Sequence, residues 1–353
     1  EHLADEIKNR SLFDPQYYLP NSQKSKLKSY PFFPETISDG FSTRDFVLIS
    51  LKSAQQCVEF QMSQDFEKII IPARYFDQLD PDYTDKQEEY TVRPFLTAIT
   101  EVGIKKPVYL TLPLTSHMIE NKTYRTKILN WVTSFPEING IYAIAALERD
   151  TKQIQSKTFM IAYMEFLTEL RKADLQLIIG YSNTESLIYS LIDDCILSFG
   201  TFENTRLFSV DKFVVMEEER RGPKARIYIP KLLNWIQFDQ AKQIKVDAPE
   251  IWSEIYEPTE YGDRALEAAT EPTFNQPGLY KHHFICFYEQ INELKKLDVV
   301  RRYDKLRTWI RDAIDLYDRI KEIPIDLEKH GDDKHLQPWL DSINHYFKKY
   351  LKA

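Results

Sequence analysis

Short, continuous apolar runs recur along the first 245 residues and predict the strands of a sheet. Most of these runs are apolar at successive positions rather than at alternate ones. That pattern is typical of strands buried on both faces, as in a parallel sheet covered by helices. The first run is short and is equally typical of an edge segment. The predicted strands are residues 17–20, 46–51, 68–73, 107–112, 140–147, 175–180, 195–200 and 225–230.

Segments with helical spacing of apolar residues lie between these runs. They predict helices at residues 90–103, 121–135, 156–173, 183–192 and 231–244. Asn183 or Thr184 is suited to cap the fourth helix, because its side-chain oxygen can accept from the first free N–H groups. Strands that alternate with helices predict right-handed βαβ units, and eight strands close a barrel. Residues 1–245 are therefore predicted to be α/β, as a TIM-like (β/α)8 barrel, with an open doubly wound sheet as the alternative.

The C-terminal third has a different pattern. Residues 246–279 are acidic and contain four prolines, which predicts an irregular connection. Three further segments have apolar residues three and four positions apart and predict helices at 280–297, 299–321 and 336–351. We expect residues 280–353 to form a helical extension that packs on the barrel or on a protein partner. The aromatic residues expected to face a partner in part are Tyr303, Trp309, Tyr317, Trp339, Tyr346 and Phe347.

Composition narrows the class of protein. A length of 353 residues suits one barrel with an extra lobe or two ordinary domains, and 43% hydrophobic and 28% charged residues are ordinary values for a globular protein. A net charge of −8 argues against binding a polyanion over the whole surface, although a local basic groove stays compatible with it. The 3 cysteines are far apart and form no CxxC pair. Neither a metal site nor a cofactor is indicated.

No apolar run approaches the roughly 18 residues of a membrane span, so no contact with a membrane is expected. Widely spaced cysteines are typical of a reducing compartment, and we expect a cytoplasmic protein. No signal peptide is visible, and the start at Glu1 leaves room for a preceding segment.

Polar residues follow most of the predicted strands, at the ends where barrels carry their functional residues. Glu148 is a candidate general base and Arg74 a candidate partner in catalysis, although Glu148 is equally suited to pair with Arg149, Lys152 or Arg74. Such loops are polar in any α/β protein, so each position also has a purely structural interpretation. The candidate ligand-binding residues are Lys52, Gly180, Tyr181, Asn183, Gly200, Thr201, Glu203, Asn204, Arg206 and Lys231.

Gly180 and Gly200 are two of only 9 glycines, and each ends an apolar run. Glycine lets the backbone approach a ligand closely, and late strand ends of many barrels bind phosphate beside a helix N-terminus. A phosphate or ribose-phosphate site is one interpretation, and ordinary turn chemistry is the other.

Two further features have open interpretations. The segment 217–226 holds four basic residues, which fits either a phosphate contact or a solvated loop neutralised by its own glutamates. His282 and His283 are adjacent and diverge by about 100° on a helix, so they cannot share a metal. We expect one ring in the core and the other exposed.

Three stretches resemble the tRNA-guanine transglycosylase superfamily of (β/α)8 barrels. They are "FDPQYYLPNSQ" near the start, "FVLISLKSA" next and "DDCILSFGTFENTRLF" late in the predicted barrel. The resemblance covers about residues 10–245 and implies a nucleotide or nucleic-acid site and base-exchange activity. Family enzymes use an aspartate nucleophile at a strand end, whereas "KIIIPARYF" places Arg74 there, with Asp77 the nearest aspartate. The family's cysteine-rich zinc site is missing.

Three functions therefore stand as hypotheses. The first is a nucleotide- or nucleic-acid-base-binding barrel protein related to the transglycosylases, in which Arg74, Glu148, Asn183 and Arg206 converge. The second is a non-catalytic subunit that binds a protein partner through its C-terminal helices. The third is a sugar-phosphate lyase of the aldolase type, which needs a buried lysine at a strand end, with Lys52 and Lys231 as candidates.

Overall fold

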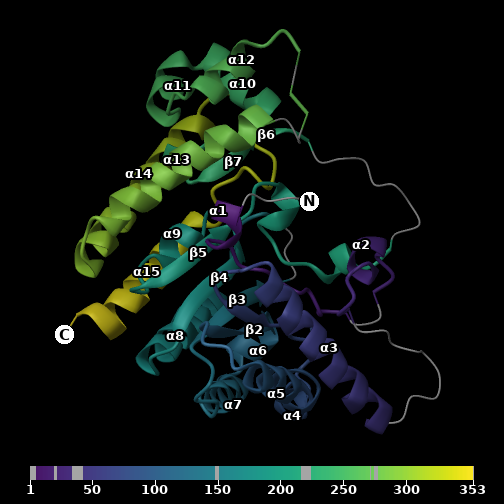
Figure 1. Cartoon of the computed structure of the whole chain (residues 1–353). Coiled ribbons are helices and arrows are strands. Elements are labelled where there is room, and N and C mark those ends of the chain that lie inside the picture. The colour runs from purple at the N-terminus through teal and green to yellow at the C-terminus, as the bar shows by residue number, and fades with distance from the viewer. Residues whose placement is uncertain are drawn as a thin grey trace. The chain divides into compact units, whose positions relative to one another are not determined.

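The computed structural model describes residues 5–19, 22–33, 43–147, 151–215, 224–270, 272–273 and 277–352. It is a mixed α/β structure whose main sheet has five strands in the order β1-β2-β3-β4-β5 (Figure 1). The strands are β1 (Ile69–Ile71), β2 (Val108–Thr115), β3 (Gly140–Ala146), β4 (Gln176–Ser182) and β5 (Cys195–Phe199). Neighbouring strands from β1 to β4 pair in parallel. Five of the eight predicted strands are thus confirmed as neighbours in one sheet.

The chain divides into two compact units. Unit 1 comprises Glu1–Leu147, Phe166–Gly180 and Phe208–Glu218, and unit 2 comprises Glu148–Glu165, Tyr181–Leu207 and Glu219–Ala353. This division does not follow the expected boundaries at residues 245 and 280. Unit 2 combines late segments of the expected barrel with the whole helical extension.

In unit 1, α3 (Thr43–Ser63) occupies the stretch in which a strand was predicted at residues 46–51, so that prediction was wrong. The reason is visible further along the same segment. Its buried positions recur three and four residues apart, which is the period of a helix and not of a strand. These buried residues are Ser50, Ser53, Ala54, Cys57, Val58 and Gln61. The predicted first strand is wrong too, because residues 17 and 18 form a turn.

Three further helices, α5 (Arg93–Val102), α7 (Lys122–Val132) and α8 (Lys157–Lys172), confirm the helices predicted at 90–103, 121–135 and 156–173, whereas α4 (Tyr83–Gln87) and α6 (Ser116–Glu120) were not predicted. α4 and α5 are joined by a π-helical turn at Glu88–Val92, two residues before Pro94. Proline has no N–H to donate, which makes this the natural place for a continuous helix to widen. α6 and α7 follow β2, and α8 follows β3.

The outer edge of β1 is protected by glutamine side chains. Gln61 of α3 accepts from the Ile70 N–H at 2.9 Å and donates to the Ile70 carbonyl at 3.1 Å. Just beyond the strand, Gln87 pairs in the same way with Arg74, at 3.1 and 2.6 Å. An unpaired strand edge invites aggregation, and a primary amide satisfies both of its backbone groups at once.

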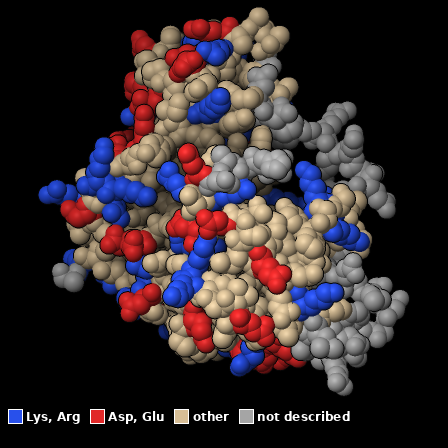
Figure 2. Space-filling model, in the orientation of Figure 1, with Lys and Arg blue, Asp and Glu red and all other residues tan. Residues whose placement is uncertain are grey.

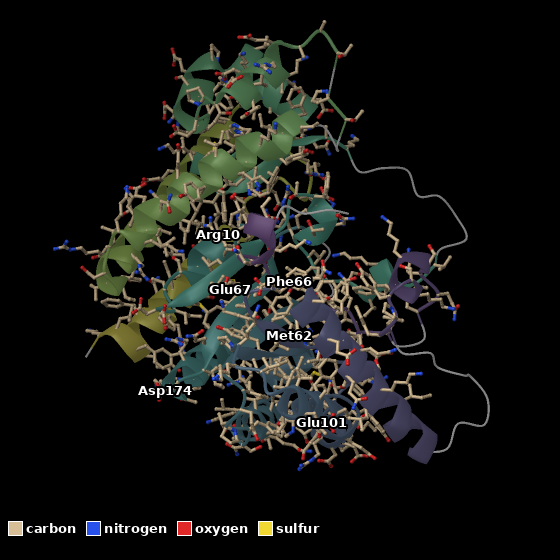
Figure 3. All side chains as sticks on the ribbon, viewed as in Figure 1. Arg10, Met62, Phe66, Glu67, Glu101 and Asp174 are labelled. Carbon is tan, nitrogen blue, oxygen red and sulfur yellow. The ribbon has the colours of Figure 1, made fainter. Side chains whose placement is uncertain are left out.

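The end of α3 is held by stacked aromatic rings. After Met62 the chain turns and Phe66 enters the core (Figure 3). The ring centroids of Phe13 and Phe66 are 5.5 Å apart in a stacked arrangement, and Phe13 also contacts Phe60 at 5.0 Å. The high aromatic content of the sequence therefore contributes to packing in unit 1.

In unit 2, β6 (Arg226–Ile229) confirms the strand predicted at 225–230. Its partner is β7 (Asn234–Gln237), to which it is antiparallel. β7 occupies the start of the segment predicted as a helix at 231–244, and α10 (Phe238–Asp247) begins only afterwards. Within the ranges that the structure describes, β6 and β7 form a sheet of their own, and a closed barrel of eight strands is not shown.

Residues 246–279 are not an irregular connection, because they include two helices. α11 (Pro249–Ile255) starts with a proline, and α12 (Glu260–Glu267) is capped by Thr259, whose hydroxyl accepts from the Gly262 N–H at 3.0 Å. Proline is favoured in the first helical turn, where its missing N–H is not needed. Pro249 therefore begins a helix, whereas the sequence pattern suggested that it interrupts regular structure.

The three C-terminal helices are confirmed as α13 (Pro277–Lys295), α14 (Val299–Lys321) and α15 (Leu336–Tyr346). Their aromatic residues largely face the interior of unit 2 rather than a partner, since Tyr303, Tyr317, Trp339 and Tyr346 are buried. His282 and His283 are both buried as well, which corrects the expectation that one is exposed. α13 packs on α12 as well as on β6, so both rings are covered.

Acidic and basic side chains are interspersed on the face drawn in Figure 2. Among the described residues, no helix has the length and apolar character needed to cross a membrane.

Candidate functional site

Polar side chains from three separate segments of unit 2 meet in one hydrogen-bonded network. Gln153 follows β3 in the chain, Asn183 and Thr184 follow β4, and Asn234 and Trp235 belong to β7. Gln153 Nε2 donates to Asn234 Oδ1 at 2.6 Å, and Trp235 Nε1 donates to Asn183 Oδ1 at 3.2 Å. All five residues are buried. Buried amides joined in this way hold the loops that follow β3 and β4 against the hairpin.

Arg206, which follows β5, extends this network and contributes a buried positive charge to it. Its guanidinium carbon lies 3.8 Å from the ring centroid of Trp235. Nε donates to the Gly200 carbonyl at 3.0 Å and Nη2 to the Thr201 carbonyl at 2.8 Å. The side chain is buried, with 6% of the residue exposed, and burial lowers the pKa of Arg206 to about 10. Arg206 therefore stays protonated at neutral pH.

Arg206 has no carboxylate within ion-pair distance in the described parts of the chain. Two of the five guanidinium N–H groups are used on carbonyls, which leaves three for which these parts supply no acceptor. The charge of Glu203 favours the protonated arginine, but only from a distance. A buried cation normally has a paired anion, so this arrangement suits an anionic ligand.

A chain of ion pairs lies in the same unit. Glu203 pairs with Lys152, and its Oε2 lies 3.8 Å from Nε of Arg226, whose guanidinium pairs with Glu328. Burial opposes ionisation of Glu328, yet the hydrogen bond from Arg226 holds the pKa of Glu328 below its usual value. Together with Arg206, these residues comprise three cations and two carboxylates, a net charge of +1.

His330 belongs to this charged group. The pKa of its imidazole is lowered, first by burial and then by the charges of Arg226 and Lys152, although Glu328 opposes them. Its Nδ1 is buried without a hydrogen-bond partner. The ring is therefore neutral at pH 7.

The two glycines have steric roles in the structure. A Cβ on Gly180 would lie 2.7 Å from Cζ of Tyr142, so this position in unit 1 admits no side chain. The positive φ of this strand end, 52°, belongs instead to Tyr181. A Cβ on Gly200 would lie 2.5 Å from the Cβ of Thr205, so Gly200 lets the loop that leads to Arg206 fold closely.

Other predicted residues of this region have different surroundings. Asn204 is exposed in a 3₁₀ turn, Glu203–Thr205. Asn183 does not cap the following helix, α9 (Ser186–Tyr189), which has Glu185 at its N-cap and no side-chain cap. The amide of Asn183 instead joins Trp235 to the Lys152 carbonyl, which its Nδ2 approaches at 3.4 Å. Thr184 likewise accepts from Gln153, at 3.4 Å.

Arg74 belongs to unit 1 and follows β1, as predicted. Its guanidinium carbon lies 5.0 Å from the ring centroid of Tyr90, and burial lowers the pKa of Arg74 to about 10. Glu148 lies outside the described residues, so the predicted pair of Arg74 and Glu148 stays a prediction.

The two candidate lysines are not at strand ends of the parallel sheet. Lys52 is exposed on α3, where the helix replaces the predicted strand. Lys231 follows β6 and pairs with Glu257 at 2.9 Å, on the rim of a cavity of about 430 Å³ that Cys286 and Trp309 also line. Neither is the buried strand-end lysine that an aldolase-type reaction needs.

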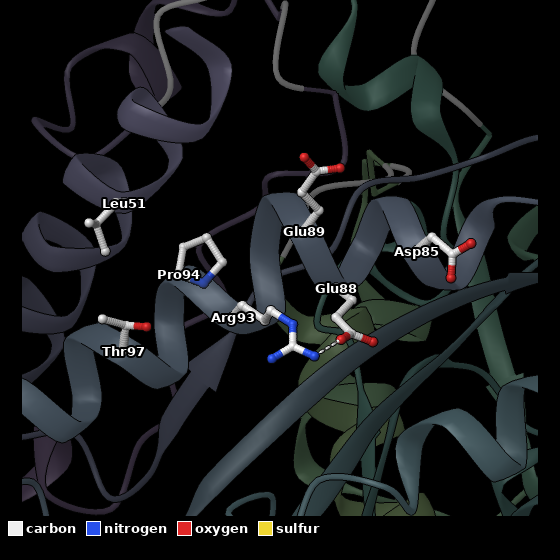
Figure 4. A pocket seen from close by; sticks show the side chains of 7 residues that line it. All are labelled: Leu51, Asp85, Glu88, Glu89, Arg93, Pro94 and Thr97. Atoms are coloured by element: carbon white, nitrogen blue, oxygen red, sulfur yellow. Dashed lines mark ion pairs between the residues drawn. The ribbon is translucent and has the colours of Figure 1, made fainter. Parts of the chain in front are cut away.

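Unit 1 has a hollow of about 470 Å³ between α3 and the widened helix (Figure 4). Asp85, Glu88 and Glu89 line it, and Arg93 pairs with Glu88. No group of three or more His, Cys, Asp or Glu side chains within the described ranges is arranged to hold a metal ion.

The sequence pattern named Asn183, Glu203 and Arg206, and it named Arg226 only as one of the basic residues of 217–226. It missed their partners Gln153, Trp235, Asn234 and Glu328. The signal for Gln153 was present, because it lies in the segment that follows the run at 140–147. Asn234 and Trp235 lie in the segment predicted as a helix at 231–244, and Glu328 lies between two of the predicted C-terminal helices.

No protein family, curated protein or solved structure matches this chain.

Proposed function

We propose that unit 2 binds a nucleotide through the segments that follow β3, β4 and β5. The observation that carries this proposal is Arg206, a buried guanidinium whose spare N–H groups have no acceptor within the described ranges. A phosphate group supplies the missing negative charge. Two of its oxygens can also accept together from the planar guanidinium donors.

The charges of the site favour a small anion over a polymer. Glu203 and Glu328 pair with Lys152 and Arg226, whereas Arg206 pairs with no carboxylate within the described ranges, which suits one anionic group. The whole chain is acidic, at −8, which disfavours non-specific binding of nucleic acid. The buried amides of Gln153, Asn183 and Asn234 supply neutral hydrogen-bonding groups of the kind that recognise a base or a sugar.

The resemblance to the transglycosylase superfamily supports a nucleotide over other small anions. Base exchange by a divergent member of that superfamily is the reaction we propose to test once a ligand is known. The resemblance implies a complete (β/α)8 barrel. The proposed binding site depends only on the five-stranded sheet and on the segments that follow its strands.

Binding of AMP, GMP, CMP, UMP and inorganic phosphate to the full chain tests the proposal by isothermal titration calorimetry at low salt. We expect at least one nucleotide to bind the wild type, and Arg206→Ala to weaken it by about tenfold or more, because a charge-assisted hydrogen bond is lost. Arg206→Lys keeps the charge without the planar donors and should bind with intermediate affinity.

Lys231→Ala is the matched control, since it removes an exposed cation of the same unit that already pairs with Glu257. It should bind like the wild type. Thermal melts of each variant separate loss of binding from loss of folding. Equal affinity of folded Arg206→Ala and wild type would overturn the proposal, as would the absence of binding to every probe.

A further inference from the structure

Hydrogen bonds fix the orientation of the Asn234 amide. Its Nδ2 donates to the Tyr317 hydroxyl at 3.0 Å and to the Asp332 carbonyl at 2.9 Å. Both N–H groups are therefore used, and the other end of the amide must be the oxygen. That oxygen, Oδ1, accepts from the Trp235 backbone N–H at 2.7 Å.

The orientation of Gln153 follows from that of Asn234. An amide that faces an acceptor oxygen must present its nitrogen, and Gln153 Nε2 lies 2.6 Å from Asn234 Oδ1. The same nitrogen lies 3.4 Å from the Thr184 hydroxyl. Rotating the amide by 180° would set two oxygens against each other. The network thus directs the Gln153 oxygen away from Asn234.

Within the described residues, the Gln153 oxygen has no partner. Oε1 is buried there without a hydrogen bond, and only 3% of Gln153 is exposed. Buried polar atoms are nearly always paired, and leaving an acceptor bare is unfavourable. Because its neighbours cannot turn without losing their own bonds, the oxygen is held ready for a donor that these residues do not supply.

We propose that Gln153 is a specificity-determining residue of the nucleotide site, whose Oε1 accepts a hydrogen bond from a neutral N–H or O–H group of the ligand. The inference rests on the function proposed above. Gln153 joins Arg206 through Asn234 and Trp235, so one network would hold both the phosphate contact and the acceptor. Two groups of a nucleotide offer such a donor, an amino group of the base and a hydroxyl group of the ribose.

The test compares AMP with two analogues, each of which lacks one kind of donor. Purine riboside 5′-monophosphate lacks the base amino group, and 2′,3′-dideoxy-AMP lacks both ribose hydroxyls. We expect the wild type to bind AMP about tenfold or more tighter than one of the two, because that analogue leaves the buried oxygen bare. The analogue that loses affinity identifies the source of the donor.

Gln153→Leu should bind AMP and that analogue with equal affinity, since the acceptor is gone. The matched control is Gln240→Leu in α10. Gln240 Nε2 donates to the Asp326 carbonyl at 2.7 Å, and its Oε1 is likewise buried without a partner, but it is no part of the Gln153 network. The control should keep the wild-type preference, because a merely structural role of a glutamine does not change the ratio of two affinities.

The wild-type ratios alone decide the inference even if Gln153→Leu fails to fold. Binding of AMP and both analogues within twofold, still dependent on Arg206, would overturn the role of Gln153 and leave the proposed function standing. A preference that persists in folded Gln153→Leu would overturn it too. Absence of binding by AMP, GMP, CMP, UMP and inorganic phosphate would overturn the proposed function and this inference with it.

Discussion

Burial shifts the pKa values of Arg206 and Asp14 in opposite directions, because it disfavours the charged form of each side chain. Burial lowers the pKa of Arg206 only to about 10, so the cation persists and needs acceptors. Burial raises the pKa of Asp14 to about 6, although hydrogen bonds from the Tyr18 hydroxyl and the Gln16 N–H oppose the shift. At pH 8 Asp14 is therefore ionised in a position where burial destabilises its charged form.

Asp14→Asn should stabilise the protein at high pH. A raised pKa in the folded state contributes stability that is complete below about pH 3.8 and is lost as the pH rises through about 6. Asparagine keeps the shape and hydrogen-bonding capacity without the charge. We expect the free energy of unfolding to rise by about 1–2 kcal/mol at pH 8 and not at pH 4, measured by urea denaturation. Equal effects at the two pH values would contradict this account.

At the scale of elements, α3 and the edge of β1 depend on each other. The helix buries one face, and Gln61 on that face completes the hydrogen bonding of Ile70. β1 has only three residues, Ile69–Ile71, so a single amide satisfies its outward-facing backbone groups. A short apolar segment therefore becomes a stable edge strand because a side chain of the preceding helix supplies the hydrogen-bond partner that a further strand would provide.

Gln61→Leu should destabilise the protein by about 2–4 kcal/mol, because it leaves a buried N–H and a buried carbonyl of Ile70 unpaired. The midpoint of urea denaturation measures the loss. Gln55→Leu is the control on the same helix, since Gln55 bonds only to Glu101 at an exposed position. That change should stay within about 0.5 kcal/mol. Similar losses in both variants would show that Gln61 does not protect the strand edge.

At the scale of the whole molecule, acid stability depends on buried neutral histidines. Burial lowers the pKa of His335 to about 3, and it lowers the pKa of His283 well below its usual value. Both residues belong to unit 2 and are about 1% exposed. Their contribution to stability is complete above about pH 6.5 and is lost as the pH falls toward the folded-state pKa values, since the unfolded chain then binds more protons.

Acidification from pH 7.5 to pH 5 should reduce the free energy of unfolding by about 2 kcal/mol through His335, with a further loss from His283, and Asp14 offsets about 1 kcal/mol of the total. In His335→Asn the loss should shrink by about 2 kcal/mol, because asparagine does not titrate in this range. Urea denaturation at the two pH values measures the difference. A variant with the full wild-type loss would rule out His335 as a source of the pH dependence.

The sequence by itself determined the elements whose signals are local. The β-rich runs at 68–73, 107–112, 140–147, 175–180 and 195–200 each became a strand of the sheet, and the C-terminal helices follow their periodicity. The same reasoning selected Asn183 and Arg206, because polar residues directly after a strand are placed by that strand. The run at 46–51 misled because six residues are too few to distinguish a strand from a helix that continues to residue 63.

Only the tertiary structure decided which polar groups meet. Gln153 and Asn234 are 81 residues apart, and Asn183 and Trp235 are 52 apart. No local pattern encodes such pairs, since each depends on how whole segments pack. Within the described residues, the unpartnered acceptor of Gln153 belongs to the same class, because its orientation depends on partners that Asn234 finds 83 and 98 residues away. Local spacing specifies an element, and the partners of a buried polar group are specified only when the elements have been brought together.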